Sequence, residues 1–273
     1  MILLFVVAGL VAVALAHTAP FPFLLEFIDR DRSVWHVPSD EGPPTVYLTF
    51  DDGPNPDATP ALLDVLAAEG ATATFFLIDR HITAETAPLV RRMFAEGHGV
   101  ALHSHTRALM AMTPDELADT LDRAADRIEQ FGGARPCGLF RPHAGWRSGK
   151  MYEGLDRGDY RLAGWSWQMW DWNWWRPARP EQLVERLAAR ASDGDIIVMH
   201  DGHHENPRAD RLGTVEATAA LIPALRARGF EFGRLCRFDG RAPDRSRAPV
   251  VEGGGVISRS SWRGRDRSTA SCP

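Results

Sequence analysis

The chain has 273 residues, of which 44% are hydrophobic and 25% charged, so it can bury a full core as one large α/β domain or two small ones. The formal net charge is −5, and no contiguous basic run lies in the part with regular hydrophobic patterning, which excludes a nucleic-acid-binding class. The three cysteines, Cys137, Cys236 and Cys272, lack paired metal-site spacing and predict no disulfide framework.

The first 24 residues are mostly apolar. Ala14-Leu15-Ala16 is typical of the small-residue site at which signal peptides are cleaved. The apolar run resumes at Pro20 and no positive charge precedes it, which fits a short, uncleaved membrane anchor equally well. A signal peptide and an N-terminal anchor therefore both remain open for residues 1–24. Either one predicts that the rest of the chain lies outside the cytoplasm, with residues 25–44 as a linker.

From Thr45 onward, short β-type runs alternate with stretches of helical periodicity. Thr113 and Glu116 form a capping pattern at the start of one such helical stretch. This alternation predicts parallel strands joined by crossover helices, and we expect about seven β/α units in a barrel or near-barrel over residues 45–236. Arg, Ser and Gly dominate residues 237–273, which predicts a disordered tail. The expected strands lie at 45–50, 72–78, 99–102, 138–140, 161–165, 195–199 and 230–233.

Polar residues directly follow most of the expected strands. The carboxyl ends of parallel strands meet at one rim, where the catalytic residues of such folds gather. Each residue alone also fits a structural role, such as a loop histidine or a helix cap, but five loops that converge on one rim predict a site. The groups are Asp51-Asp52, His103-Ser104-His105, Arg141-Pro142-His143, Asp171-Trp172 and His200-Asp201.

Five short motifs resemble those of the polysaccharide deacetylases that share the NodB homology domain (carbohydrate esterase family 4). The resemblance runs from about Thr45 to Phe232 and implies a NodB-like, distorted (β/α) barrel. It also implies metal-assisted removal of acetyl groups from an N- or O-acetylated carbohydrate, such as a cell-wall or extracellular glycan. The motifs are Thr49 to Pro54, Gly97-His98 through His103-Ser104, Phe140-Arg141-Pro142 with Gly145, Trp165-Ser166 with Asp171-Trp172, and Val198-Met199-His200.

Amide hydrolysis needs an activated water, a stabiliser for the oxyanion and an acid for the leaving nitrogen. Two adjacent carboxylates at a strand end can divide the first task, since their side chains diverge. The resemblance implies that Asp51 is the general base and that Asp52 binds a divalent cation, for which we expect Zn²⁺. It implies His103 as a second ligand of this cation.

The resemblance also implies roles around this pair. Arg141 is expected to lie against Asp51, Asp171 to orient Arg141, and His200 to act as the acid. The remaining tryptophans of the segment after Trp165 suit either stacking on sugar rings or packing. The expected substrate-binding groups are the backbone N–H of Ala144, the Trp172 ring and His143.

The chain departs from the family's second motif at Arg107, where the resemblance implies a histidine ligand. A guanidinium has no lone pair to offer a cation. Three outcomes stay open: His105 replaces the ligand, another residue such as His143 or His203 enters the coordination sphere, or the metal is weakened or lost. Further departures, His143-Ala144 in place of Pro-Tyr and Gln168 in place of Asp, indicate a divergent branch.

Loss of the metal through Arg107 defines the alternative function, a non-catalytic carbohydrate-binding or regulatory relative. A binder needs only the cleft, whereas an enzyme must keep base, acid and metal, and their retention favours the enzyme. A glycosidase fits poorly, because adjacent carboxylates cannot lie on opposite sides of a sugar. The retained residues are Asp51, Asp52, Arg141, Asp171 and His200.

Overall fold

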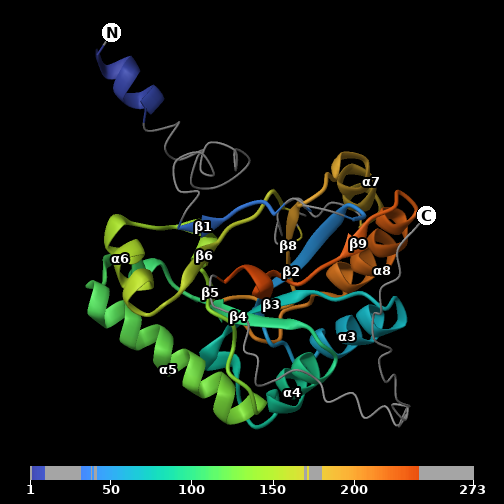
Figure 1. Cartoon of the computed structure of the whole chain (residues 1–273), viewed down its shortest axis with the longest axis horizontal. Helices are drawn as coiled ribbons and strands as arrows, with labels where there is room; N and C mark the ends of the chain where they lie inside the picture. The colour runs from blue at the N-terminus through green and yellow to red at the C-terminus, as the bar shows by residue number, and fades with distance from the viewer. Residues whose placement is uncertain are drawn as a thin grey trace, which may run out of the picture. The chain divides into compact units, whose positions relative to one another are not determined.

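The computed structural model describes residues 2–9, 32–37, 39, 42–168, 171 and 180–239 (Figure 1). The chain divides at Arg241 into two units, and the second, 242–273, lies outside the described residues. The predicted tail therefore lies outside them too, apart from its first three residues. So do residues 1 and 10–24 of the predicted leader or anchor and half of the predicted linker, namely residues 25–31, 38, 40 and 41.

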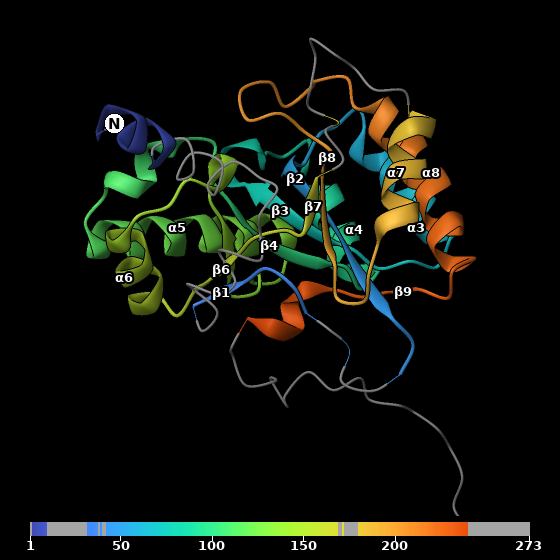
Figure 2. The same cartoon turned by 90° about the horizontal axis from the view of Figure 1, so that it is seen from above.

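A parallel sheet forms the centre of the first unit (Figures 1 and 2). Its strand order is β1-β6-β5-β4-β3-β2-β8-β7, and β9 pairs with β2 off this path. Every ladder between these strands is parallel, which confirms the predicted α/β class. The strands are β1 (Ser33–Val34), β2 (Thr45–Gly53), β3 (Thr74–Ile78), β4 (Gly99–His103), β5 (Leu139–Arg141), β6 (Arg161–Ala163), β7 (Trp167–Gln168), β8 (Ile196–His200) and β9 (Glu231–Phe232).

The helices surround this sheet in nearly the order of the strands. Contacts link α6 to α5, α5 to α4, α4 to α3, α3 to α8, and α8 to α7. Figure 2 shows the two ends of this ring, with α5 and α6 on one side and α3, α7 and α8 on the other. Such a ring is the outer layer of a (β/α) barrel. The helices are α3 (Thr59–Ala68), α4 (Ala87–Ala95), α5 (Pro114–Gly132), α6 (Gly149–Arg157), α7 (Pro180–Arg190) and α8 (Leu212–Arg226).

The barrel closes irregularly, at the junction of β1 with β8. An isolated antiparallel bridge joins His36 to Asp195 there, and the Ser166 hydroxyl donates to the Trp35 carbonyl over 3.0 Å. This irregular closure is the distortion that the sequence resemblance implies. Because β1 lies within residues 25–44, the folded part begins before the boundary expected at Thr45.

Alternation along β2 separates two apolar layers. Leu48 and Phe50 are buried in the larger core cluster, together with side chains of the surrounding helices, whereas Tyr47 packs in a smaller cluster with Phe76 and Val198. Since successive side chains of a strand point to opposite faces, Thr49 and Asp51 share the face of Tyr47. A carboxylate is thereby directed to the inner side of the barrel.

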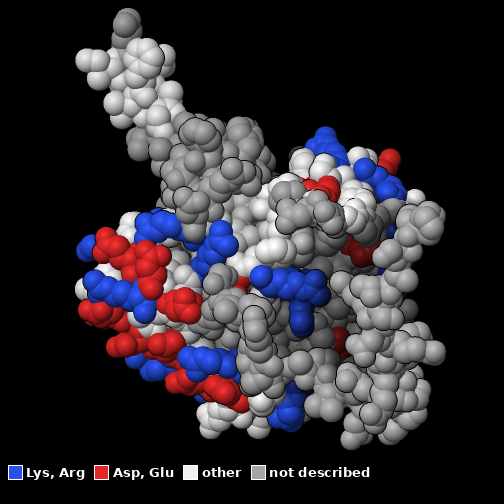
Figure 3. Space-filling model, viewed as in Figure 1, with Lys and Arg blue, Asp and Glu red and all other residues white. Residues whose placement is uncertain are grey.

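Helix α5 has the N-terminus that its sequence predicts. Thr113 and Glu116 form a reciprocal capping box there. On its outer side, Arg135 bonds Asp122 and Asp126, and Figure 3 shows acidic and basic side chains interleaved over α5 and α6. Exposed pairs of this kind contribute about 0–1 kcal/mol each, so the buried apolar face stabilises the helix.

Residues 2–9 are helical, and their large apolar side chains are exposed, from 82% at Ile2 to 49% at Val7. Within the described residues, no helix combines the length and the apolar character that crossing a bilayer requires.

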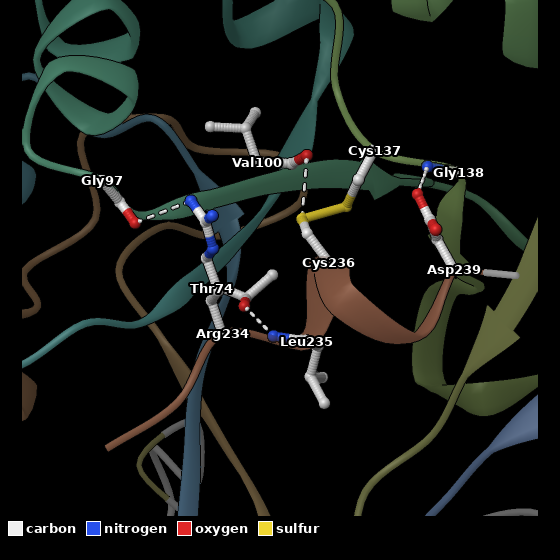
Figure 4. The surroundings of a disulfide bond; sticks show 9 residues. All are labelled: Thr74, Gly97, Val100, Cys137, Gly138, Arg234, Leu235, Cys236 and Asp239. Carbon is white, nitrogen blue, oxygen red and sulfur yellow. Dashed lines mark hydrogen bonds between the residues drawn. A yellow bond between two sulfur atoms is a disulfide. The ribbon is translucent and has the colours of Figure 1, made fainter. Parts of the chain in front are cut away.

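A disulfide joins Cys137 to Cys236 (Figure 4). It links the segment before β5 to the 3-10 helix η4 (Leu235–Phe238). A hydrogen bond joins the same two segments, since the Asp239 carboxylate accepts from the Gly138 backbone N–H over 3.1 Å. The expectation of no disulfide was wrong. The two cysteines are 99 positions apart, and no local spacing signals their pairing, which the fold alone creates.

Replacing both bonded cysteines by alanine is expected to lower the free energy of unfolding by about 4–5 kcal/mol, because the cross-link closes a loop of roughly 100 residues in the unfolded chain. Urea denaturation of the wild type and the double variant measures the difference. A reductant should bring the wild type to the level of the variant and leave the variant unchanged. Equal midpoints without reductant would contradict the prediction.

Candidate active site

The two adjacent aspartates occupy an irregular end of β2. The register between β2 and β3 shifts between Asp51 and Gly53. Asp52 has a φ of 70°, a left-handed conformation that residues other than glycine rarely adopt and that persists only where the surroundings enforce it. The two side chains consequently diverge, and Asp51 contacts Arg141 while Asp52 lies against His103.

The backbone at Asp52 is held from two sides. His81 is buried, and its Nδ1 lies 3.0 Å from the Asp52 carbonyl oxygen. Gly202 packs on the same carbonyl, and a Cβ there would lie 2.1 Å from the oxygen. Any other residue at position 202 would displace the strand end, so this glycine is required by close approach.

Arg141 compensates the Asp51 carboxylate in the interior. Its guanidinium is 0% exposed and donates from Nη1 to Asp51 Oδ1 over 2.6 Å and to Thr49 Oγ1 over 2.8 Å. Nη2 donates to the Gly164 carbonyl over 2.8 Å. Burial lowers the pKa of Arg141, and the charge of Asp51 opposes that shift. A buried carboxylate needs such a partner, and Arg141 supplies it in the place that the sequence predicts.

Asp171 orients a different residue from the one expected. Its Oδ1 lies 2.8 Å from His200 Nδ1, and its Oδ2 accepts the His200 backbone N–H over 2.7 Å. Arg211 donates to its carbonyl, and Thr214 donates to its Oδ2. The expectation that Asp171 orients Arg141 was wrong, because the loop after β7 places Asp171 beside β8, whereas Gly164, Asp51 and Thr49 surround the guanidinium.

The pair with Asp171 keeps His200 charged. Burial alone would lower the pKa of His200, but the charge of Asp171 and its hydrogen bond, with the charges of Asp52 and Asp51, raise it to about 9. The imidazole side chain is 17% exposed at the end of β8, so its other nitrogen is available toward the rim. His200 is therefore a protonated acid at neutral pH.

Asp52, His103 and His143 bring one potential metal-ligating atom each to within 4.8 Å of one another. His103 Nδ1 lies 2.7 Å from the Arg141 carbonyl, which can only accept, so this nitrogen carries the proton. In the neutral imidazole, Nε2 then presents a lone pair 3.3 Å from Asp52 Oδ1. Asp52 Oδ1 is buried and has no hydrogen-bond partner among the described residues. Two acceptors that face each other fit a cation between them.

The ionisation states of Asp52 and His143 suit the binding of a metal cation. Burial would raise the pKa of Asp52, but the facing His103, when its Nε2 is also protonated, and the charges of His200 and His143 hold it well below its usual range. Burial, followed by the charges of His103 and His204, lowers the pKa of His143 to about 4. A ligated carboxylate must be ionised and a ligated imidazole neutral, so both groups are in the required state at neutral pH.

The other candidates from the second motif lie elsewhere. The Arg107 side chain is exposed, with its guanidinium carbon 5.1 Å from the centre of the Trp146 ring. His105 is absent from the cluster of three ligating residues found within the described part of the chain. His204, which no sequence motif singled out, packs against His143 in a tilted arrangement with ring centres 4.6 Å apart, and His203 packs against His204.

The tryptophans divide between packing and segments outside the described residues. Trp165 is buried against Trp35, and Trp167 donates from Nε1 to Asp195 over 2.9 Å, so these two have packing roles. Ala144 is exposed with a φ of 52° in the turn after β5, and its role as oxyanion donor stays a prediction. Outside the described residues lie Trp170, Trp172, Trp174 and Trp175.

Comparison with known proteins identifies the family of this chain. The model of the polysaccharide deacetylase family matches residues 39–163. A chitooligosaccharide deacetylase from Bradyrhizobium sp. (strain ANU 289) is 38% identical over 202 residues, which cover 71% of this chain and 90% of the relative. The chain belongs to the polysaccharide deacetylase family. Its members act on acetylated carbohydrates, as the sequence resemblance implies.

Two further relatives of this deacetylase define its neighbourhood. A peptidoglycan-N-acetylglucosamine deacetylase from Bacillus cereus is 31% identical, over 72% of this chain and 88% of the relative. A family 4 acetyl xylan esterase from Clostridium thermocellum, solved with a cobalt ion, is 29% identical, with a TM-score of 0.62, over 71% of this chain and 89% of the esterase. The fold and the use of a divalent metal by the family are thereby confirmed.

Several groups of this deacetylase site had no sequence signal. The residues His81, His204, Arg211 and Thr214 lie outside the quoted motifs. Tertiary packing brings them to the site, His81 from the 3-10 helix η1 (Asp79–His81) and Thr214 from α8. Asp201 is buried, bonds the Thr59 hydroxyl, and has a pKa raised to about 7 by burial and by the charge of Asp52. The sequence placed it next to His200 but assigned it no role.

Proposed function

We propose that this protein hydrolyses acetyl groups from N-acetylated amino-sugar glycans with the help of a bound divalent cation. The observation that carries the proposal is the buried Asp52 Oδ1, which accepts no hydrogen bond from the described residues and faces His103 Nε2 beside the Arg141-bonded carboxylate of Asp51. The names of two relatives, which specify chitooligosaccharide and peptidoglycan N-acetylglucosamine, support an N-acetylated amino sugar as the substrate.

Asp52 and His103 would hold the cation, and their oxygen and nitrogen donors suit Zn²⁺. When bound, the metal polarises the acetyl carbonyl and lowers the pKa of a ligated water. Asp51 accepts the proton of the attacking water, and Arg141 keeps the carboxylate in one orientation. His200 donates its proton to the departing nitrogen, and Asp171 maintains its charge. The Ala144 N–H is the proposed donor to the oxyanion, with Trp172 against the acetyl methyl.

Acetate release from chitotetraose, from acetylated peptidoglycan and from acetylated xylan tests the proposal and separates N- from O-deacetylation. We expect release from the N-acetylated substrates, complete loss in a chelator, and recovery with Zn²⁺ or Co²⁺. Asp52→Ala should lose both bound metal and activity, because it removes a ligand. Activity that survives the chelator, or no release from any of the three glycans, would overturn the proposal.

We also propose that the folded part works outside the cytoplasm. The disulfide between Cys137 and Cys236 supports an oxidising compartment, and the exposed apolar residues 2–7 support a leader or anchor. Fractionation of expressing cells tests this placement, and a reduced protein in the cytoplasmic fraction would contradict it.

A further inference from the structure

Arg107 stands at the sequence position where the family resemblance implies a second histidine ligand, and its side chain lies over Trp146. Arg107 begins the 3-10 helix η2 (Arg107–Ala111), is exposed, and covers the ring of Trp146. An arginine cannot ligate a metal, and this one is engaged with an aromatic ring. With Asp52 and His103 alone, a cation would have only two protein ligands, fewer than the three that catalytic zinc sites use.

His143 brings a third ligating atom to the same point from a different loop. It follows β5 by two residues and is half-buried, with a ligating atom within 4.8 Å of those of Asp52 and His103. One carboxylate and two imidazoles leave one position of a tetrahedral zinc site open for water or substrate. This donor set matches what a catalytic site needs.

The two histidines are held together by the loops that carry them. The His143 backbone N–H donates to the Ser104 hydroxyl over 2.9 Å, and Ser104 directly follows His103. The His103 ring in turn donates to the Arg141 carbonyl, two residues before His143. These two hydrogen bonds join the ends of β4 and β5, so the His103 ring and the backbone that carries His143 are fixed relative to each other without a metal.

We propose that His143 is the third protein ligand of the metal, and that this ligand has moved from the loop after β4 to the turn after β5. The proposal rests on the proposed function, since it concerns the same cation. It identifies the position of Arg107 as a surface position that has no part in coordination. The His204 ring packs against His143, with the ring centres 4.6 Å apart and the planes tilted by 53°.

Metal affinity, measured apart from activity, tests the assignment. The full chain is stripped of metal, then titrated with Zn²⁺ in competition with a chromophoric chelator, and separately with Co²⁺, whose visible absorption reports the number and geometry of ligands. We expect one equivalent bound. His143→Ala should weaken Zn²⁺ binding by more than about 100-fold, since outer-shell substitutions alone cost about 10–100-fold. It should also change the Co²⁺ spectrum.

Two matched variants serve as controls. His105→Ala and Arg107→His alter the neighbouring histidine and the expected ligand position, and each should keep the wild-type Zn²⁺ affinity within about threefold, close to the scatter expected for residues outside the coordination sphere. Circular dichroism and thermal unfolding verify that each variant is folded. Wild-type affinity in His143→Ala, or a loss of affinity in His105→Ala comparable to that expected for His143→Ala, would overturn the assignment.

The measurement also separates this assignment from the proposed function. A protein that binds Zn²⁺ through His143 but releases no acetate would overturn the function and retain the ligand. A metal-dependent deacetylase whose affinity is indifferent to His143→Ala would retain the function and overturn the ligand. Tighter binding in Arg107→His would show that the position after β4 still competes for the metal, which contradicts the relocation.

Discussion

Asp51→Asn is expected to lower kcat for acetate release by about 10²–10⁴-fold, the usual contribution of a general base, while one equivalent of metal stays bound. The asparagine keeps an oxygen near Arg141 Nη1 but has no basic carboxylate to accept the proton of water. The metal is retained because Asp52 diverges from Asp51 toward His103. Acetate release and metal content of the purified variant check both halves of the prediction.

Burial of Arg141 complicates this variant, because the guanidinium loses its counter-charge. We expect the free energy of unfolding to fall by about 1.5–3 kcal/mol, the range for hydrogen bonds to charged groups, with the remaining bonds to Thr49 and Gly164 keeping the arginine in place. Asp195→Asn is the matched control, a buried carboxylate at the opposite end of β8 that bonds Trp167. It should be destabilised and remain active. If Asp51→Asn instead lost its metal, the roles of the two aspartates would be reversed.

Asp171→Asn is expected to lower the pKa of His200 and with it the activity, because the imidazolium loses its buried counter-charge. In the metal-free wild type, nuclear magnetic resonance should show the His200 imidazolium losing its proton with a pKa of about 9. Without the Asp171 carboxylate, the pKa of His200 should fall, because its burial is then opposed only by the charges of Asp52 and Asp51. The alkaline limb of the pH–rate profile should move down by the same amount. An unchanged limb would remove His200 from the role of acid.

The sign of the accompanying stability change follows from linkage. The folded-state pKa of His200 lies above its unfolded value, so the pair with Asp171 stabilises the fold fully below pH 6.5 and loses this contribution as the pH rises through about 9. Asp171→Asn should therefore flatten the dependence of the melting temperature on pH between these values. His200→Ala should flatten it equally.

The fold class and the residue types at the rim could be predicted from the amino-acid sequence alone. Short apolar runs between helical stretches require parallel strands, and parallel strands bring their carboxyl ends together, so Asp51, Asp52, His103, Arg141 and His200 had to meet. The contact of Arg141 with Asp51 was implied by the family resemblance, and it agrees with the general need of a buried carboxylate for a cation. The prediction of the fold class depends on local periodicity and charge, which can be recognised within short stretches of the sequence.

Which residues of different loops touch depended on the tertiary structure. Loop paths placed Asp171 on His200 in place of Arg141, brought His143 beside Asp52 and His103 while Arg107 lies over Trp146, joined Cys137 to Cys236 across 99 positions, and drew β1 into the sheet from the expected linker. A side chain's direction at a loop end depends on backbone angles such as the left-handed φ of Asp52 and on packing from distant segments. Neither is encoded in the spacing of residues along the chain, because the contacts that enforce them form only when the barrel has closed.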